Sequence, residues 1–167
     1  ILGQNTLLAM RDVMDQMDAI PAAYGRFMSS LTFTPPMFHQ RDVPPSNKMQ
    51  PVDFLVVSYG LKLEYVKAFW RYRGMMVRNG EDIHLSMTYH LECNRDSVVP
   101  IAEKNTEIQN LGRDSVASYK KPGHMKNRAI LLRTWVTVGY QPMKVPASSL
   151  PVISKEIRQF YLSRLRY

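Results

Sequence analysis

Histidine is the residue type in this sequence best suited to bind a metal or to transfer protons. The sequence has four histidines, His39, His84, His90 and His124. No two of them are four residues apart, the spacing that places two ligands on one face of a helix. If residues 83–93 form a strand, His84, His90 and Glu92 share one face and would make a carboxylate and imidazole metal site. Three ligand-type residues are close to chance in a chain of this length, so we expect no metal and no cofactor.

The nucleophilic residues lack the surroundings that activate them. Cys93 is the only cysteine, and no basic neighbour favours its thiolate. Ser148 and Ser149 lie in a proline-flanked connector, without the glycines that expose a nucleophilic serine. The eight glycines are scattered singly, whereas a phosphate-binding loop needs several of them before a Lys-Ser or Lys-Thr pair. We therefore expect a protein that is not an enzyme, and a small enzyme built on His84, His90 and Cys93 is the least favoured hypothesis.

Basic and aromatic residues alternate in three segments, 69–73, 119–121 and 160–167. This combination binds RNA by pairing phosphates with cations and by stacking bases on rings. In the first and third segments the aromatic residues fall on the apolar stripe of a helix, so packing is the simpler interpretation. The loop 119–124 has no such competing role. The predicted RNA-binding residues are Lys120, Lys121, Lys126, Arg128, Arg158, Arg164 and Arg166.

The formal net charge of +8 is concentrated in the last third of the chain. Residues 112–167 hold eleven Lys and Arg against only Asp114 and Glu156, whereas residues 61–111 hold seven of each sign. An excess of this kind repels itself in an isolated protein, so it indicates an anionic partner such as nucleic acid or a lipid surface. The simpler interpretation is a solvated basic face.

The elements that would position these residues are expected to be mostly helical. Helices are expected at residues 7–17, 21–30, 61–76, 97–112, 126–135 and 149–167. In the last of these, Ile157, Phe160 and Tyr161 are expected to face inward, and Arg158 and Arg164 outward. Residues 82–93 fit a strand and a helix about equally badly.

Residues 32–51 form the most irregular segment of the sequence. They contain five prolines, which fix backbone angles and remove amide donors, so neither a helix nor a central strand can run through them. We expect a single domain over 1–167, with an extended proline-rich arm at 32–51 and a basic C-terminal third at 112–167. The predicted fold class is mainly α, with several amphipathic helices joined by long, Pro-rich extended segments and no large sheet. The longest aliphatic runs have four residues, against about 20 for a membrane-spanning helix.

Several motifs, taken in order, resemble one known family. After the opening helix come Pro21-Ala22-Ala23-Tyr24 with Phe27, then the segment 35–41 (PPMFHQR), and then a helix that ends in 69–74 (FWRYRG). The stretch 102–112 (AEKNTEIQNLG) is similar to a Glu-Lys-x-Thr-Glu-Leu-Gln-x-Leu-Gly element. Over residues 7–112 this order is similar to that of the mitochondrion-specific small-ribosomal-subunit protein twenty-three family.

This resemblance implies a structural protein of the mitochondrial small ribosomal subunit, in the mitochondrial matrix. It implies that the protein holds ribosomal RNA and other small-subunit mitoribosomal proteins in place, with no enzymatic role and no small-molecule substrate. A single cysteine excludes an internal disulfide framework and is typical of a reducing compartment. The alternative is a non-catalytic accessory subunit of another mitochondrial complex, such as a respiratory-chain assembly, which needs no RNA.

Overall fold

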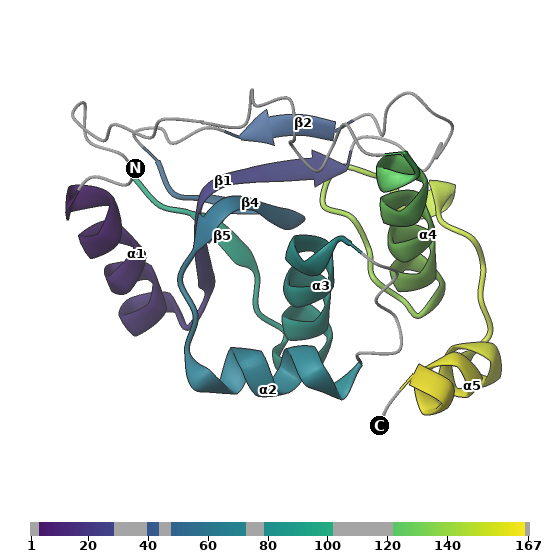
Figure 1. Ribbon diagram of the computed structural model, residues 1–167. Helices are drawn as coiled ribbons and strands as arrows, with labels where there is room; N and C mark the ends of the chain where they lie inside the picture. Colours follow the sequence, from purple (N-terminus) through teal and green to yellow (C-terminus); the bar gives the residue numbers. More distant parts are fainter. Residues whose placement is uncertain (1–3, 29–39, 44–47, 73–78, 102–121, 166–167) are drawn as a thin grey trace.

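The computed structural model describes residues 4–28, 40–43, 48–72, 79–101 and 122–165. Figure 1 shows a sheet with helices packed below and beside it. The helices are α1 (Gln4–Met17), α2 (Leu63–Arg71), α3 (Glu81–Cys93), α4 (His124–Thr137) and α5 (Lys155–Leu165). The strands are β1 (Ile20–Met28), β2 (Gln40–Val43), β3 (Gln50–Val52), β4 (Phe54–Tyr59) and β5 (Ser97–Val99). No helix in the described ranges is long and apolar enough to span a membrane.

The mixed sheet shows that the predicted fold class, mainly α with no large sheet, is wrong. Its described strands follow the order β2-β1-β5-β3, and β4 pairs with β1 off this path. Strand β1 is antiparallel to β2 and β4 and parallel to β5, with Gly25 opposite both Val43 and Leu55. The fold therefore combines a five-stranded sheet with helices, in which β1 pairs with β2, β4 and β5, and β3 pairs with β5.

Strand β1 replaces the helix expected at residues 21–30. Its sequence is rich in small residues, and Tyr24, Phe27 and Met28 can be placed on one side of a helix as easily as along a strand. Pairing with three other strands decides in favour of the strand, because tertiary contacts override weak local preference. A Cβ atom at Gly25 would lie 2.5 Å from Val52 Cγ2, so this glycine permits a close approach between β1 and β3.

Strand β5 replaces the start of the helix expected at residues 97–112, of which residues 102–112 lie outside the described part. Within the expected arm at 32–51, residues 32–39 and 44–47 also lie outside it, while β2 and β3 occupy the two ends of the strand path. Pro51 lies in β3, opposite Val98. Proline lacks an amide donor, and an end strand tolerates that loss because it pairs on one side only.

Residues 82–93, for which the sequence favoured neither a strand nor a helix, form helix α3. It lies between two apolar clusters, with Ile83 and Met87 in one and Leu85 and Tyr89 in the other. The first cluster also contains Trp135 of α4, and the second contains Tyr65 of α2. The helices expected near residues 7–17, 61–76 and 126–135 correspond to α1, α2 and α4, so the presence of these three helices is confirmed. Helix α2 ends at Arg71, short of the expected end, and residues 73–76 lie outside the described part.

A buried carboxylate joins the sheet to the segment that follows α4. Asp53 accepts hydrogen bonds from the Met28 amide at 2.6 Å, the Tyr140 hydroxyl at 2.7 Å and the Met143 amide at 2.8 Å. Burial raises the pKa of Asp53, and these three donors partly offset that effect. The donors come from segments far apart in the sequence, so Asp53 fixes their relative positions.

Candidate nucleic-acid interface

Helix α5 begins six residues later than the sequence suggested. Ser149 and Pro151 were expected to open it, but residues 147–149 form a separate short 3-10 turn and α5 starts at Lys155. The Ser154 hydroxyl accepts a hydrogen bond from the Ile157 amide at 3.3 Å, the role of an N-cap residue. Ser154 therefore marks the start of α5.

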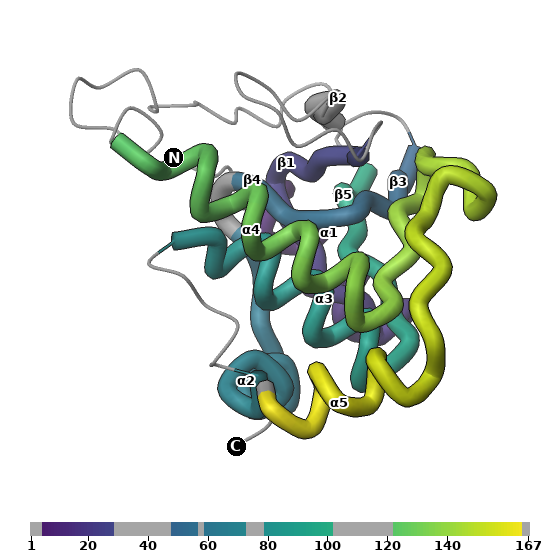
Figure 2. Tube along the Cα trace, turned by 90° about the vertical axis from the view of Figure 1, so that its right-hand side faces the viewer, coloured from purple at the N-terminus to yellow at the C-terminus, as the bar shows by residue number. Residues whose placement is uncertain are grey.

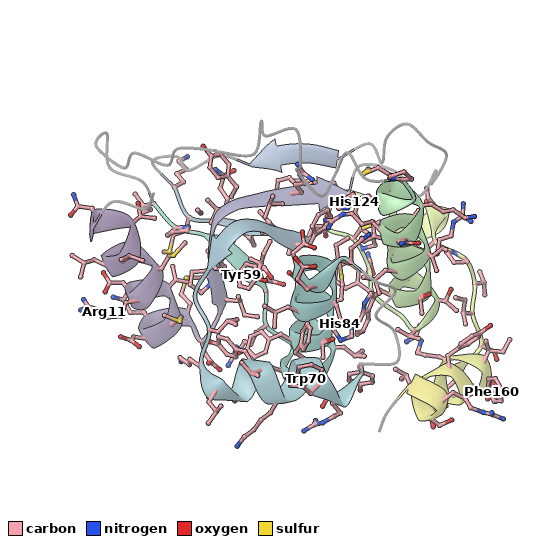
Figure 3. The ribbon with its side chains drawn as sticks, in the orientation of Figure 1. Arg11, Tyr59, Trp70, His84, His124 and Phe160 are labelled. Carbon is pink, nitrogen blue, oxygen red and sulfur yellow. The ribbon has the colours of Figure 1, made fainter. Side chains whose placement is uncertain are left out.

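The apolar side chains of α5 face outward, so the prediction that Ile157, Phe160 and Tyr161 point into the core is wrong. Phe160 is 56% exposed, and Ile157 and Tyr161 are also exposed. Among the side chains of α5 that the structure describes, Leu162 is the partly buried one that packs against the main core. Ile157 and Phe160 lie about half a turn around the helix from it. Figure 3 shows Phe160 projecting away from the rest of the molecule.

Three exposed cations accompany these side chains: Lys155, Arg158 and Arg164. The guanidinium of Arg164 lies over the Phe160 ring, 5.2 Å from its centroid, a cation–π arrangement. Arg158 extends to the loop after α4, where a Cβ atom at Gly139 would lie 2.6 Å from its guanidinium carbon. Gly139, with φ of 112°, thus provides the space that holds Arg158.

The cations of α5 form no ion pair within the part of the chain that the structure describes. Glu156 is the only acid of the helix. The pKa of Glu156 is lowered because its own backbone amide and the Ser154 hydroxyl donate to the carboxylate. Lys155, Arg158 and Arg164 are all exposed, so the positive charge of α5 faces solvent.

Helix α2 presents a second exposed ring close to α5. Trp70 is 55% exposed and lies with Leu63 and Lys67 on the face opposite the buried Tyr65. Figures 1 and 2 both place the C-terminal end of α2 beside α5, at the lower edge of the molecule. Rings and cations therefore occur together on two neighbouring helices, the arrangement that lets bases stack while phosphates pair with cations.

The structure divides the predicted RNA-binding residues between two places. Arg158 and Arg164 lie on α5, whereas Lys126 is exposed in the first turn of α4. Figure 3 shows His124, at the start of α4, at the top of the molecule and Phe160 at the lower right, so these two places are far apart. Lys120, Lys121 and Arg166 lie outside the described residues.

Arg128 requires a correction, because its side chain is not available to a phosphate. Its two terminal nitrogens each donate to a carboxylate oxygen of Asp82 at 2.8 Å, and both residues are buried. A buried guanidinium that donates from both terminal nitrogens to one carboxylate holds α4 against α3. We therefore remove Arg128 from the candidate interface and treat it as part of the core.

A group of ionisable side chains surrounds Asp18, which follows α1 with φ of 49°. Its carboxylate accepts hydrogen bonds from Lys62 at 3.3 Å and Tyr89 at 3.2 Å. Burial alone would raise the pKa of Asp18, but the hydrogen bond and charge of Lys62 bring it below the ordinary value. Burial also raises the pKa of Tyr89. These groups satisfy one another and join α1 to α2 and α3.

The metal site that a strand at 83–93 would have formed is absent from the described part of the chain, because that segment is helical. His84 is buried and its Nε2 atom lies 2.9 Å from the Phe69 carbonyl oxygen, while His90 pairs with Asp96 at 3.3 Å. Glu92 contacts Arg71 and Tyr72. No cluster of three metal-binding residues occurs in the described ranges. Burial raises the pKa of Cys93, which disfavours its thiolate.

Comparisons with known proteins add no family to these observations. No family model matches the chain, and no curated protein or solved structure matches it.

Proposed function

We propose that this protein is a non-catalytic structural component of a ribonucleoprotein, and that α5 is its contact with RNA. The observation that carries this proposal is the exposed surface of α5, where Arg158 and Arg164 lie beside Phe160 and Tyr161 without an ion-pair partner among the described residues. Unpaired cations attract phosphates, and exposed rings stack on bases.

The particle we propose is the mitochondrial small ribosomal subunit, in the mitochondrial matrix. The support for it is the order of motifs over residues 7–112 and the concentration of positive charge after residue 112. A protein fixed among ribosomal RNA and neighbouring proteins needs exposed charged and apolar surfaces more than it needs a catalytic cleft, and α2 and α5 supply such surfaces.

The binding test compares two double variants with equal loss of charge. Arg158→Gln with Arg164→Gln removes two cations from α5. Arg11→Gln with Arg95→Gln removes one cation from α1 and one from the segment after α3, where Arg11 contacts Asp12 and Arg95 contacts Asp18. We expect the α5 variant to flatten the salt dependence of single-stranded RNA binding by about 1.4 log units per log unit of salt. The matched variant should change it little. Fluorescence anisotropy at several salt concentrations measures both, and equal slopes for the two variants would disprove RNA contact by α5.

An accessory subunit of another mitochondrial complex is the second candidate. The exposed apolar side chains Leu63, Val152 and Ile157 favour it, because such residues commonly pack against another protein. Sedimentation of the native assembly separates the two candidates. Co-migration with small-subunit ribosomal RNA that is lost after nuclease treatment supports the ribonucleoprotein, whereas unchanged migration supports the accessory subunit.

A further inference from the structure

The α1 side of the molecule carries an apolar groove that the proposed RNA contact does not use. Its volume is about 200 Å³. Met17 comes from α1, Met49 precedes β3, and Ile101 follows β5. All three side chains are more than 40% exposed, so the apolar wall of the groove is open to solvent.

The size and lining of this groove fit one aromatic side chain. An apolar cavity of about 150 Å³ accommodates benzene, so the groove has room for a single ring. Met17 and Met49 contribute thioethers, which adapt their shape and make favourable contacts with aromatic rings.

The charge around the groove favours a ring with a cation beside it. Asp12 lines the groove, and Asp15 is exposed on the same helix. Arg11 pairs with Asp12 at 3.0 Å, while Asp15 forms no ion pair within the described residues. With one Arg against two Asp, α1 has a net charge of −1 in a chain of net charge +8, and this difference favours a basic partner on the α1 side.

The chain itself carries such a ring. Phe160 on α5 is exposed, and the guanidinium of Arg164 lies over its ring. Trp70 is another exposed ring, with Lys67 on the same face of α2. Arg71 beside it is already paired with Glu92, whereas Phe160 has a guanidinium directly over its ring. Figures 1 and 2 place α1 and α5 on opposite sides of the molecule, so the groove cannot receive α5 of its own chain.

We propose that the groove between α1, Met49 and Ile101 binds Phe160 of a second copy of this chain. The two contacting surfaces differ, so each contact leaves one groove and one α5 free for the next copy. Such a head-to-tail interface produces rings or open chains and not only dimers. This inference goes beyond the proposed function, which requires one copy, and RNA on α5 would compete with it.

The test uses the 167-residue chain, free of nucleic acid, in analytical ultracentrifugation. A small interface with one aromatic anchor predicts a dissociation constant on the order of 100 µM, so the protein is examined up to about 1 mM. We expect the average mass to rise with concentration to well above twice the monomer mass of 19.3 kDa. Met49→Lys and Phe160→Glu change exposed residues at the two proposed surfaces, and each variant should remain monomeric. Trp70→Glu is the matched control and should assemble like the parent.

Mixing the two monomeric variants tests whether the interface is head-to-tail, with the groove of one copy binding α5 of another. A mixture of Met49→Lys and Phe160→Glu has one intact groove and one intact α5, so it should form 1:1 dimers and nothing larger. Circular dichroism checks that each variant is folded. A parent that stays monomeric, a mixture that stays monomeric although both variants are folded, or loss of assembly in Trp70→Glu would each overturn the proposal. The RNA-binding test with the α5 variants is read separately, so RNA binding without self-association leaves the proposed function standing.

Discussion

Helices α3 and α5 are both weakly amphipathic, for opposite reasons. Every residue from Asp82 to Tyr89 in α3 is buried. In α5 every described side chain from Lys155 to Arg164 is exposed, except that of Leu162, which is partly buried. A strong apolar periodicity marks a helix that is buried on one side only, so it is absent both when all sides are covered and when almost none is.

The comparison also shows what burial demands of polar residues. In α3 the Asp82 carboxylate pairs with Arg128, the Ser86 hydroxyl bonds to the Leu55 amide at 3.1 Å, and the Tyr89 hydroxyl donates to the Asp18 carbonyl at 2.9 Å. These partners come from several elements of the fold, and their hydrogen bonds offset the free-energy cost of burying these polar groups. The polar residues of α5 need no such partners, because water solvates them.

The largest expected effect comes from leaving the buried acid of α3 unpaired. Arg128→Met removes both hydrogen bonds to Asp82 while keeping much of the apolar volume, and we expect a loss of about 3–5 kcal/mol in the free energy of unfolding. Chemical denaturation measures this value. Lys126→Met, two residues earlier and exposed, is the matched control and should change stability by less than about 0.5 kcal/mol.

A second substitution sharpens this prediction. Replacing Asp82 by Leu in the Arg128→Met background removes the unpaired charge, so most of the lost stability should return. If the double variant is as unstable as Arg128→Met alone, packing and not the buried charge accounts for the loss.

A smaller effect is expected from pH, through His84. Burial lowers the pKa of His84 below its ordinary value of 6.5, so the unfolded chain binds a proton more readily than the folded one. Stability attributable to His84 is therefore complete above pH 6.5 and is lost as pH falls below it, by up to about 1.4 kcal/mol per pH unit. The pKa of His124 is lowered as well, first by burial and then by Arg128, so it adds to the same trend.

Denaturation curves between pH 7 and pH 5 separate the two histidines. His84→Met should show a clearly shallower loss of stability with falling pH than the parent, and His124→Gln should change the slope less, because His124 is only partly buried. A parent-like slope in His84→Met would mean that His84 does not titrate with folding.

The sequence predicted the helices that are buried on one side, and it failed where pairing between distant segments decides the structure. Tyr65 and Tyr72 of the stripe near α2 are buried as their spacing required. The small residues of β1 gave no comparable signal, because a strand covered by three partners depends on contacts with β2, β4 and β5 that local periodicity does not record.

The candidate interface was predictable only where local charge and helical spacing determine it. The positions of Arg158 and Arg164 on α5 follow from charge and helical spacing. The exposure of Trp70 could also have been found, since this residue lies off the Tyr65 and Phe69 stripe. The burial of Arg128 could not, because its partner Asp82 is 46 residues away.

The smallest expected effect on stability lies at the apolar face of α5. Phe160→Ala removes a large ring, yet the ring is 56% exposed and contacts Arg164 and Tyr161 of its own helix. Since little apolar surface is removed from water there, we expect a change below about 0.5 kcal/mol. Met87→Ala, at a fully buried position of α3, is the matched truncation and should cost about 2–5 kcal/mol. Both are measured by denaturation at a few micromolar, about tenfold or more below the dissociation constant proposed for self-association, on the order of 100 µM. Comparable losses in the two variants would show that α5 is packed as a core helix, and the contrast between α3 and α5 would fail.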